Sequence, residues 1–288
     1  FPPGGTTDAF ARRIAEKMRG TYANNVIVDN KPGAGGQIGV TTLKSAAADG
    51  AHILYSPASM LTIYPHSYSR LNYAQSDVTP IGIGHSTDHA FVVGPAVPDS
   101  VKNIKDFVEW AKANPGKLSF GSSGVGAAAH LTSELLKYTA GINMVHVPYK
   151  GGGPALNDVI GGQVPLFFGN LASTLQHVQS GKLRALAVTS DKRSSSLPDV
   201  PTLSESGLKG TEIYEWNAVF APANTPEPVM KKLAAAFQQA LESPEVKARV
   251  AQLGGEIQKG TPEQAKKFIE QQASLWNRVI KERNITIE

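Results

Sequence analysis

The chain has 288 residues, no cysteine and a formal net charge of +4 at pH 7. These values exclude disulfides, thiol catalysis and cysteine-bound zinc, and the basic residues are too scattered for a face that follows nucleic-acid phosphates. No apolar run is as long as a membrane-spanning helix requires. With 41% hydrophobic and 18% charged residues, the composition is that of a globular protein.

The chain opens with a glycine turn, FPPGGTTD, which runs directly into an amphipathic helix. Phe10, Ile14 and Met18 recur at helical spacing and share one face of that helix. The apolar run at 26–28 has the composition of a strand, and a glycine-rich turn and a second helix follow it. We also expect a strand before Phe1, because the corresponding turn later in the chain has one.

That later turn belongs to a second copy of the same pattern. Residues 118–120 are predicted to be a short strand, FGSSGVG a glycine turn, and the segment around Leu131 and Leu135 an amphipathic helix. A β-rich run, a lysine followed by glycines, and another helix complete the copy. Two lobes of alternating strands and helices follow from this repeat, each with a mostly parallel sheet flanked by helices. Chance similarity of two ordinary segments is the alternative.

The predicted lobes are discontinuous in sequence. Lobe 1 comprises residues 1–94 and 222–288, and lobe 2 comprises residues 95–221, so that two strands cross between them. After the second crossing we expect only helices. Two of these helices carry the serine or threonine cap followed by proline that marks a helix start, at Ser243 and at Thr261.

Several enzymatic and cofactor chemistries are not supported. The glycine turns lack the P-loop lysine, the G-x-G-x-x-G spacing and the G-x-S-x-G nucleophile elbow. Ser122 or Ser123 with His130 is the only candidate pair of nucleophile and base, and Ser123 and His130 are two helical turns apart. We therefore predict no catalytic residue and no cofactor, and keep a serine hydrolase of α/β type as the least favoured alternative.

A second polar cluster, GHSTDH, contains His85, Asp88 and His89. Two histidines and an aspartate this close could ligate a metal, but such a group is more typical of a solvated loop. We predict no metal site and assign no role to these three residues.

The two glycine turns are the best candidates for a binding site. Each lies at a helix N-terminus, where free backbone amides and the helix dipole attract anions, and small residues let a ligand approach the main chain. The alternative is that Thr7 or Asp8, and Ser122 or Ser123, only cap their own helices. The carboxyl ends of strands add further polar residues. The residues predicted to bind ligand are Thr6, Thr7, Asp8, Ser56, Ser59, Ser122, Ser123, Gly126, Ala127, Ala128, Tyr149 and Asn170.

These motifs resemble the extracytoplasmic receptors of tripartite tricarboxylate transporters, also called Bug-type receptors. The resemblance covers essentially the whole chain and is carried by FPPGGTTD, VDNKPGAGGQIG, FGSSGVGAAAHL, HVPYKGGGPALNDVIGGQV and LRALAVTSDKRSSSLPDVPTLSESG. It implies a type II periplasmic-binding-protein-like fold. It also implies that the two lobes close on a small carboxylate, held by Thr6, Thr7 and Asp8 on one side and by Ser122 and residues 126–128 on the other.

Two features depart from the family pattern. Gly169 stands where the family usually has an aspartate, and His85 and His89 stand in a segment that is usually less polar. We expect both changes to favour a more anionic or differently shaped ligand.

The function that the resemblance implies is that of a monomeric periplasmic receptor, exported and freed of its signal peptide. It would carry a mono- or dicarboxylate, aromatic acids included, to the permease subunits of a tripartite tricarboxylate transporter. Presentation of the ligand to a membrane signalling protein is the alternative, which the sequence does not separate from transport.

Overall fold

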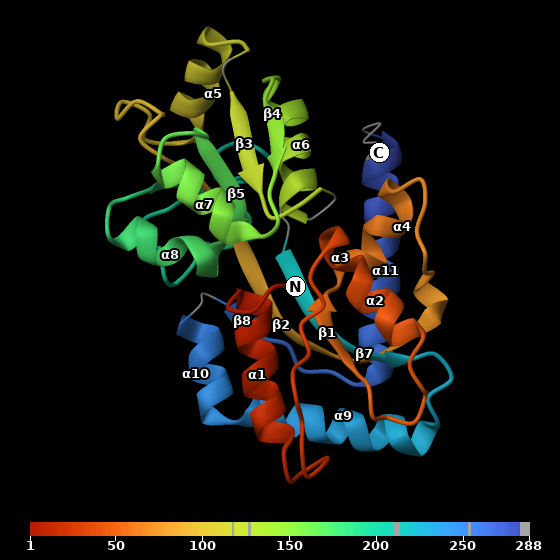
Figure 1. The fold of residues 1–288 in the computed structure, drawn as a ribbon. Helices are drawn as coiled ribbons and strands as arrows, with labels where there is room; N and C mark the ends of the chain where they lie inside the picture. Colours follow the sequence, from red (N-terminus) through yellow and green to blue (C-terminus); the bar gives the residue numbers. More distant parts are fainter. Residues whose placement is uncertain (117, 126–127, 210–213, 253–254, 283–288) are drawn as a thin grey trace. The chain divides into compact units, whose positions relative to one another are not determined.

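The computed structural model describes residues 1–116, 118–125, 128–209, 214–252 and 255–282 (Figure 1). Contacts within the chain divide it into unit 1, Phe1–Ser86 with Trp216–Glu288, and unit 2, Thr87–Glu215. Both boundaries fall inside strands, in β2 (Val78–Val93) and β7 (Tyr214–Pro222). The boundaries predicted from the sequence lie further along the chain than these.

Unit 1 packs helices against a sheet in which β1 (Leu54–Pro57) runs antiparallel to β7, and β7 and the short β8 (Gly255–Ile257) both neighbour β2. Its helices are α1 (Thr6–Met18), α2 (Gln37–Lys44), α3 (Ser59–Thr62), α4 (Tyr64–Ser67), α9 (Glu227–Glu242), α10 (Pro244–Gln252) and α11 (Pro262–Glu282), with 3-10 turns at Ala34–Gly36 and Gln75–Asp77.

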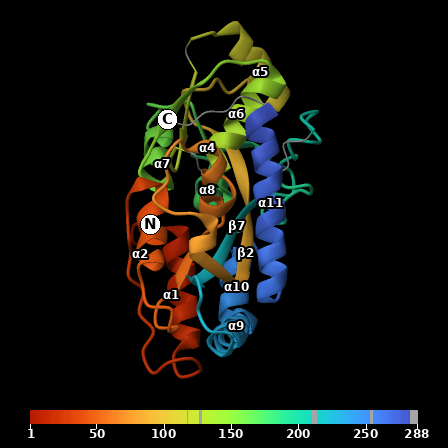
Figure 2. The same ribbon diagram turned by 90° about the vertical axis from the view of Figure 1, so that its right-hand side faces the viewer.

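The core of unit 1 lies between the sheet and helices α1, α9 and α10. Phe10, Ile14 and Met18, the predicted apolar face of α1, are buried there against Leu233 and Phe237 of α9. Figure 2 shows α11 lying along β7, where Trp216 meets Phe268 edge-on with ring centroids 4.4 Å apart. Burial of Phe10, Ile14 and Met18 anchors α1, and with it the turn that precedes α1.

Unit 2 has helices on both faces of its sheet. Strands β3 (Ser119–Ser122), β4 (Val145–Pro148) and β5 (Leu166–Asn170) are parallel, while β5 and β6 (Arg184–Val188) pair antiparallel with β2. Helices α5 (Ile104–Ala113) and α6 (Ala128–Ala140) cover one face, and α7 (Gly152–Ile160) and α8 (Leu171–Gln179) contribute to the core on the other.

Helix starts expected from the sequence are present. The Ser243 hydroxyl accepts a hydrogen bond from the Val246 amide at the start of α10. At the start of α11, Thr261 and Gln264 exchange side-chain and backbone hydrogen bonds at 3.2 and 2.8 Å. These reciprocal bonds satisfy two of the amides that a helix leaves free at its beginning.

Two expectations about strands were wrong in unit 1. Residues 26–28 form no strand, and Ile27 is 84% exposed. A strand is stable only where a neighbouring strand completes its backbone hydrogen bonds. The segment after the second crossing is not purely helical, because it contains β8. The pairing of β1 with β7 is antiparallel, a detail that the expectation of a mostly parallel sheet did not specify.

Gly169 in β5 has a packing reason to be glycine. A Cβ atom added there would lie 2.3 Å from Cζ of Phe167, whose ring is 1% exposed. A buried ring in a close-packed core has little room to move aside. The packing of the Phe167 side chain therefore explains why this position holds glycine and not aspartate.

We predict that Gly169→Ala lowers the free energy of unfolding by about 1–3 kcal/mol, as overpacking does. Gly153→Ala is the matched control, since nothing lies within 4 Å of its added Cβ. Combining Gly169→Ala with Phe167→Leu should cost less than the sum of the two single changes, because the smaller side chain clears the space. Strict additivity in urea unfolding would contradict this account.

Candidate functional site

The turn before α1 leaves backbone amides available at a helix N-terminus. Gly4 has a φ of 84°, and the N-cap residue Gly5 makes no side-chain capping hydrogen bond. Within the described part of the chain, the hydroxyls of Thr6 and Thr7 have no hydrogen-bond partner. The first turn of α1 therefore offers amide and hydroxyl donors, together with the positive end of the helix dipole.

Asp8 is the residue that fixes this turn. Its side chain is 4% exposed, and its carboxylate accepts hydrogen bonds from the Gly4 amide at 2.9 Å, Arg12 Nε at 3.0 Å and Asn30 Nδ2 at 2.9 Å. Burial alone would raise the pKa of Asp8, but the hydrogen bonds from Arg12, the Gly4 amide and Asn30 together lower it to about 2. The carboxylate is thus charged, and its charge is already balanced within unit 1.

Asn30 belongs to the same network, which the sequence analysis did not identify. Its Nδ2 also donates to the Phe1 carbonyl at 3.1 Å, and its Oδ1 accepts from Arg12 Nη2 at 3.0 Å. Asn30 therefore ties the segment before α2 to the turn before α1. Asn30 stands directly before the KPGAGG turn, and this position was the available signal in the sequence. The contact of Asn30 with Asp8, however, joins residues far apart in the sequence.

The other predicted residues of unit 1 lie at the end of β1. Ser56 is buried, and its hydroxyl faces Met60 Sδ at 3.1 Å. Ser59 begins the short helix α3 and is also buried. Among the described residues, neither serine forms a side-chain hydrogen bond with the turn before α1.

Three strands of unit 2 bring predicted residues to one edge of its sheet. Ser122 ends β3, Asn170 ends β5 and Tyr149 follows β4, and these strands are parallel. The Tyr149 amide donates to the Ser122 carbonyl at 3.1 Å. Carboxyl ends of parallel strands are where sheets of this kind bind ligands.

Ser122 is fully buried and already hydrogen-bonded. Its hydroxyl lies 2.7 Å from His146 Nε2 and 3.1 Å from the Gly124 carbonyl, and it accepts from the Gly124 amide at 3.3 Å. Gly124 has a φ of 155°. Ser122 therefore holds the second glycine turn as Asp8 holds the first, and its hydroxyl is engaged by His146 and Gly124.

His146 stacks on His130 with ring centroids 3.9 Å apart and 14° between the planes. Burial, followed by the neighbouring His130 and Lys137, lowers the pKa of His146 to about 3. Burial and Lys137 lower the pKa of His130 to about 4. Both imidazoles are therefore uncharged at neutral pH.

The remaining predicted residues of unit 2 are held by partners of their own. The Tyr149 hydroxyl donates to Asp158 at 2.6 Å, and burial with this contact raises the pKa of Tyr149 to about 12. Asn170 Nδ2 donates to the Thr87 hydroxyl at 2.6 Å, and its Oδ1 caps α8. The Ser123 carbonyl accepts from the Gly151 amide at 3.2 Å.

Two of the predicted ligand-binding residues, Gly126 and Ala127, lie outside the described residues. Ala128 is the first residue of α6 and is buried.

The cluster of His85, Asp88 and His89 is not the solvated loop that we expected. These residues lie in β2, and the two histidines are 1% and 2% exposed. His85 Nδ1 lies 2.5 Å from the Tyr55 hydroxyl in unit 1, whereas His89 lies in unit 2 beside Glu215. Among the described residues, no group of three potential ligands is placed to hold a metal ion.

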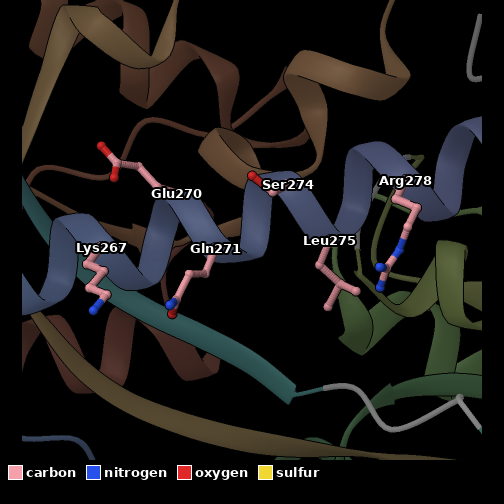
Figure 3. Close-up of a pocket in the computed structure, with 6 residues that line it drawn as sticks. All are labelled: Lys267, Glu270, Gln271, Ser274, Leu275 and Arg278. Atoms are coloured by element: carbon pink, nitrogen blue, oxygen red, sulfur yellow. The ribbon is translucent and has the colours of Figure 1, made fainter.

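An open groove in unit 1 lies elsewhere, on one face of α11 (Figure 3). It is lined by Lys267, Glu270, Gln271, Ser274, Leu275 and Arg278. It contains none of the predicted ligand-binding residues. No helix of the described chain has the length and apolar character to cross a membrane.

A two-unit α/β protein with polar glycine turns at helix starts is the architecture of a solute-binding protein. The chain belongs to the tripartite tricarboxylate transporter family receptors, whose family pattern matches residues 10–285. This confirms the family and fold class predicted from the sequence. The family consists of receptors and not of enzymes, so the hydrolase alternative is excluded.

Curated relatives cover almost the whole chain. Protein BugT of Bordetella pertussis is 34% identical over 288 residues, covering 98% of this chain and 86% of BugT. The "UPF0065 protein in tcbD-tcbE intergenic region" of Pseudomonas sp. is 37% identical over 284 residues, covering 98% of this chain and 84% of that protein.

Solved structures agree with the fold. The periplasmic binding protein BugD has a TM-score of 0.92 at 38% identity, covering 100% of this chain and 96% of BugD. Rpa4515 of R. palustris with adipate has a TM-score of 0.93 at 30% identity, covering 99% and 95% of the two chains. MatC of Rhodopseudomonas palustris with bound malate has a TM-score of 0.90 at 26% identity, covering 97% and 96%.

The Asp8 network predicts an acid-dependent loss of stability. Because the folded-state pKa lies below the usual 3.8, the stabilisation is complete above about pH 4 and is lost as the pH falls toward 2. Asp8→Asn should lower the free energy of unfolding at pH 7 by about 2 kcal/mol and flatten its decline between pH 4 and 2. Glu16→Gln, at an exposed ion pair with Arg13, is the control and should change neither. Equal slopes for wild type and Asp8→Asn would contradict the prediction.

The stacked histidines predict a second acid effect, in unit 2. Their folded-state pKa values lie below 6.5, so the unfolded chain binds more protons and stability falls as the pH drops from about 6.5 toward 4. His146→Gln keeps a partner for Ser122 but does not titrate. It should lose less free energy of unfolding than wild type over this range, on the order of 2 kcal/mol less at pH 4. The exposed His52→Gln should follow wild type, and parallel curves for His146→Gln would refute the assignment.

Proposed function

We propose that this chain is a periplasmic receptor for a small mono- or dicarboxylate, aromatic acids included. It would deliver that acid to the membrane permease subunits of a tripartite tricarboxylate transporter. The observation that carries the proposal is the N-terminus of α1, which has no side-chain cap and where the hydroxyls of Thr6 and Thr7 have no partner among the described residues. The bound adipate and malate of the two solved relatives support the class of ligand.

A carboxylate suits this helix start for electrostatic reasons. The free amides of the first helical turn and the helix dipole stabilise a negative charge without a cationic side chain. The nearby carboxylate of Asp8 does not oppose this, because Arg12 and Asn30 already bond to it. Arg12 is in turn occupied by Asp8 and Asn30.

Within the predicted set, the contacts favour two different roles. Thr6 and Thr7 have donors to give to a ligand, and we propose that they contact it. Asp8 and Ser122 are buried and bonded to the glycine turns, and we propose that they act by holding Gly4 and Gly124 in place. Closure of the two lobes on the ligand, a monomeric state and periplasmic location stay predictions.

A panel of acids tests the proposal directly. Adipate, malate, succinate and benzoate are titrated by calorimetry and thermal shift, with the neutral diamides of the first three and benzamide as controls. A ligand at one hundred times its Kd should add about 2.7 kcal/mol to the free energy of unfolding. Binding of at least one acid without its amide is the expected result. Equal binding of an acid and its amide, or no response to any acid, would overturn the proposal.

For an acid that binds, we predict that Thr7→Ala weakens the affinity by about 1 kcal/mol, roughly five-fold, as the loss of one neutral hydrogen bond does. Thr42→Ala is the matched control: this exposed threonine bonds to the Ile38 carbonyl within α2. Calorimetric Kd values for both variants decide the point. An unchanged Kd for Thr7→Ala would remove Thr7 from the binding site.

A further inference from the structure

His89 in unit 2 has one ring nitrogen bonded and one without a partner. Its side chain is 2% exposed, and Nε2 lies 3.3 Å from a carboxylate oxygen of Glu215. Nδ1 is buried, and no described residue forms a hydrogen bond with it. A buried polar atom left in this state costs about 1–3 kcal/mol, so a native structure usually supplies a partner.

The place of His89 in the sheet links it to the predicted site. His89 of β2 is the register partner of Asn170 at the end of β5. Side chains of directly opposed residues in an antiparallel pair lie on the same face, about 5 Å apart at Cβ. Thr87, two residues before His89 on β2, bonds to the Asn170 side chain on that face. His89 is therefore a neighbour of Asn170 at the polar edge of the sheet.

The contact with Glu215 decides what Nδ1 can do. A carboxylate only accepts hydrogen bonds, so the proton of a neutral imidazole belongs on Nε2. In that neutral ring Nδ1 is a hydrogen-bond acceptor, and it calls for a donor. A second carboxylate at Nδ1 would face an acceptor with no proton, close to the negative charge of Glu215.

We propose that His89 determines ligand specificity: its Nδ1 accepts a hydrogen bond from a hydroxyl or ammonium group of the bound acid, while Glu215 holds Nε2. This inference rests on the proposed function and adds the class of acid, one that carries a donor substituent. It differs from the expectation drawn from the sequence that the histidines favour a more anionic ligand. The main chain at His89 is fixed independently, by exchange of hydrogen bonds with Thr189.

The test compares acids that differ by one donor group. Malate and aspartate each add one donor to succinate, and adipate reports binding of a plain dicarboxylate. Calorimetry should show malate or aspartate bound about ten-fold more tightly than succinate by wild type. Equal affinities for the three four-carbon acids would overturn the role of His89. Failure of all four acids, and of benzoate, to bind would instead overturn the proposed function.

Two variants separate the two ring nitrogens. The amide of His89→Asn reaches about as far as Nδ1, and the amide of His89→Gln about as far as Nε2. His89→Asn should retain part of the preference over succinate, whereas His89→Gln should lose it and still bind succinate like wild type. Circular dichroism and thermal unfolding report whether each variant folds. Loss of all acid binding by a folded His89→Gln would show a structural role and contradict the proposal.

Nitrogen-15 NMR of the wild-type imidazoles tests the same point without relying on a variant's stability. Nε2 of His89 should carry a proton, and the Nδ1 signal should shift on addition of malate but remain that of an unprotonated nitrogen. An imidazolium signal in the complex would show that an anion is bound at Nδ1. An Nδ1 signal unchanged by malate would show that its partner is water. Either result would overturn the inference.

Discussion

In each unit, a buried side-chain oxygen accepts the amide hydrogen of a glycine in a turn near the start of a helix. Asp8 does this for Gly4 in unit 1, at 2.9 Å, and Ser122 does it for Gly124 in unit 2, at 3.3 Å. Both glycines have positive φ values, so few other residues could follow the same path. Without these bonds the turns would lose the conformation that exposes the amides around them, and the proposed binding of an anion depends on that conformation.

The two anchors solve the same electrostatic problem differently. Asp8 brings a negative charge, which the Arg12 guanidinium balances and to which Asn30 donates a hydrogen bond. Ser122 brings no charge, and its partner His146 stays neutral because burial lowers its pKa to about 3. In both units the turn is held by polar groups that add no unbalanced negative charge. A carboxylate can therefore approach main-chain amides without being repelled by the residues that position them.

The parts of the structure that depend on local sequence were predictable. The buried face of α1 followed from the spacing of Phe10 and Ile14, and the start of α11 from Thr261 and Pro262. Contacts between distant segments were not, because no local pattern encodes them: Asn30 reaches Asp8, and His146 reaches Ser122, across 22 and 24 residues. The prediction of a strand at 26–28 was wrong for the same reason, because β-type residues form a strand only when another strand lies beside them.

Main-chain amides would account for the proposed binding of acids as a class, but they would not decide which acid is preferred. An amide donor is the same whatever the side chains, so turns of this kind bind carboxylates as a class. The family includes structures with adipate and with malate at 30% and 26% identity to this chain, one acid without a hydroxyl and one with it. Discrimination between such ligands needs side chains with a fixed donor or acceptor next to the turns. At the edge of unit 2, the end of β5 and the adjacent part of β2 supply that position: Gly169 is kept small by the ring of Phe167, and His89 lies opposite Asn170. Packing therefore limits what position 169 of β5 can offer a ligand, and in the proposal above the side chain that distinguishes one acid from another is His89 of β2.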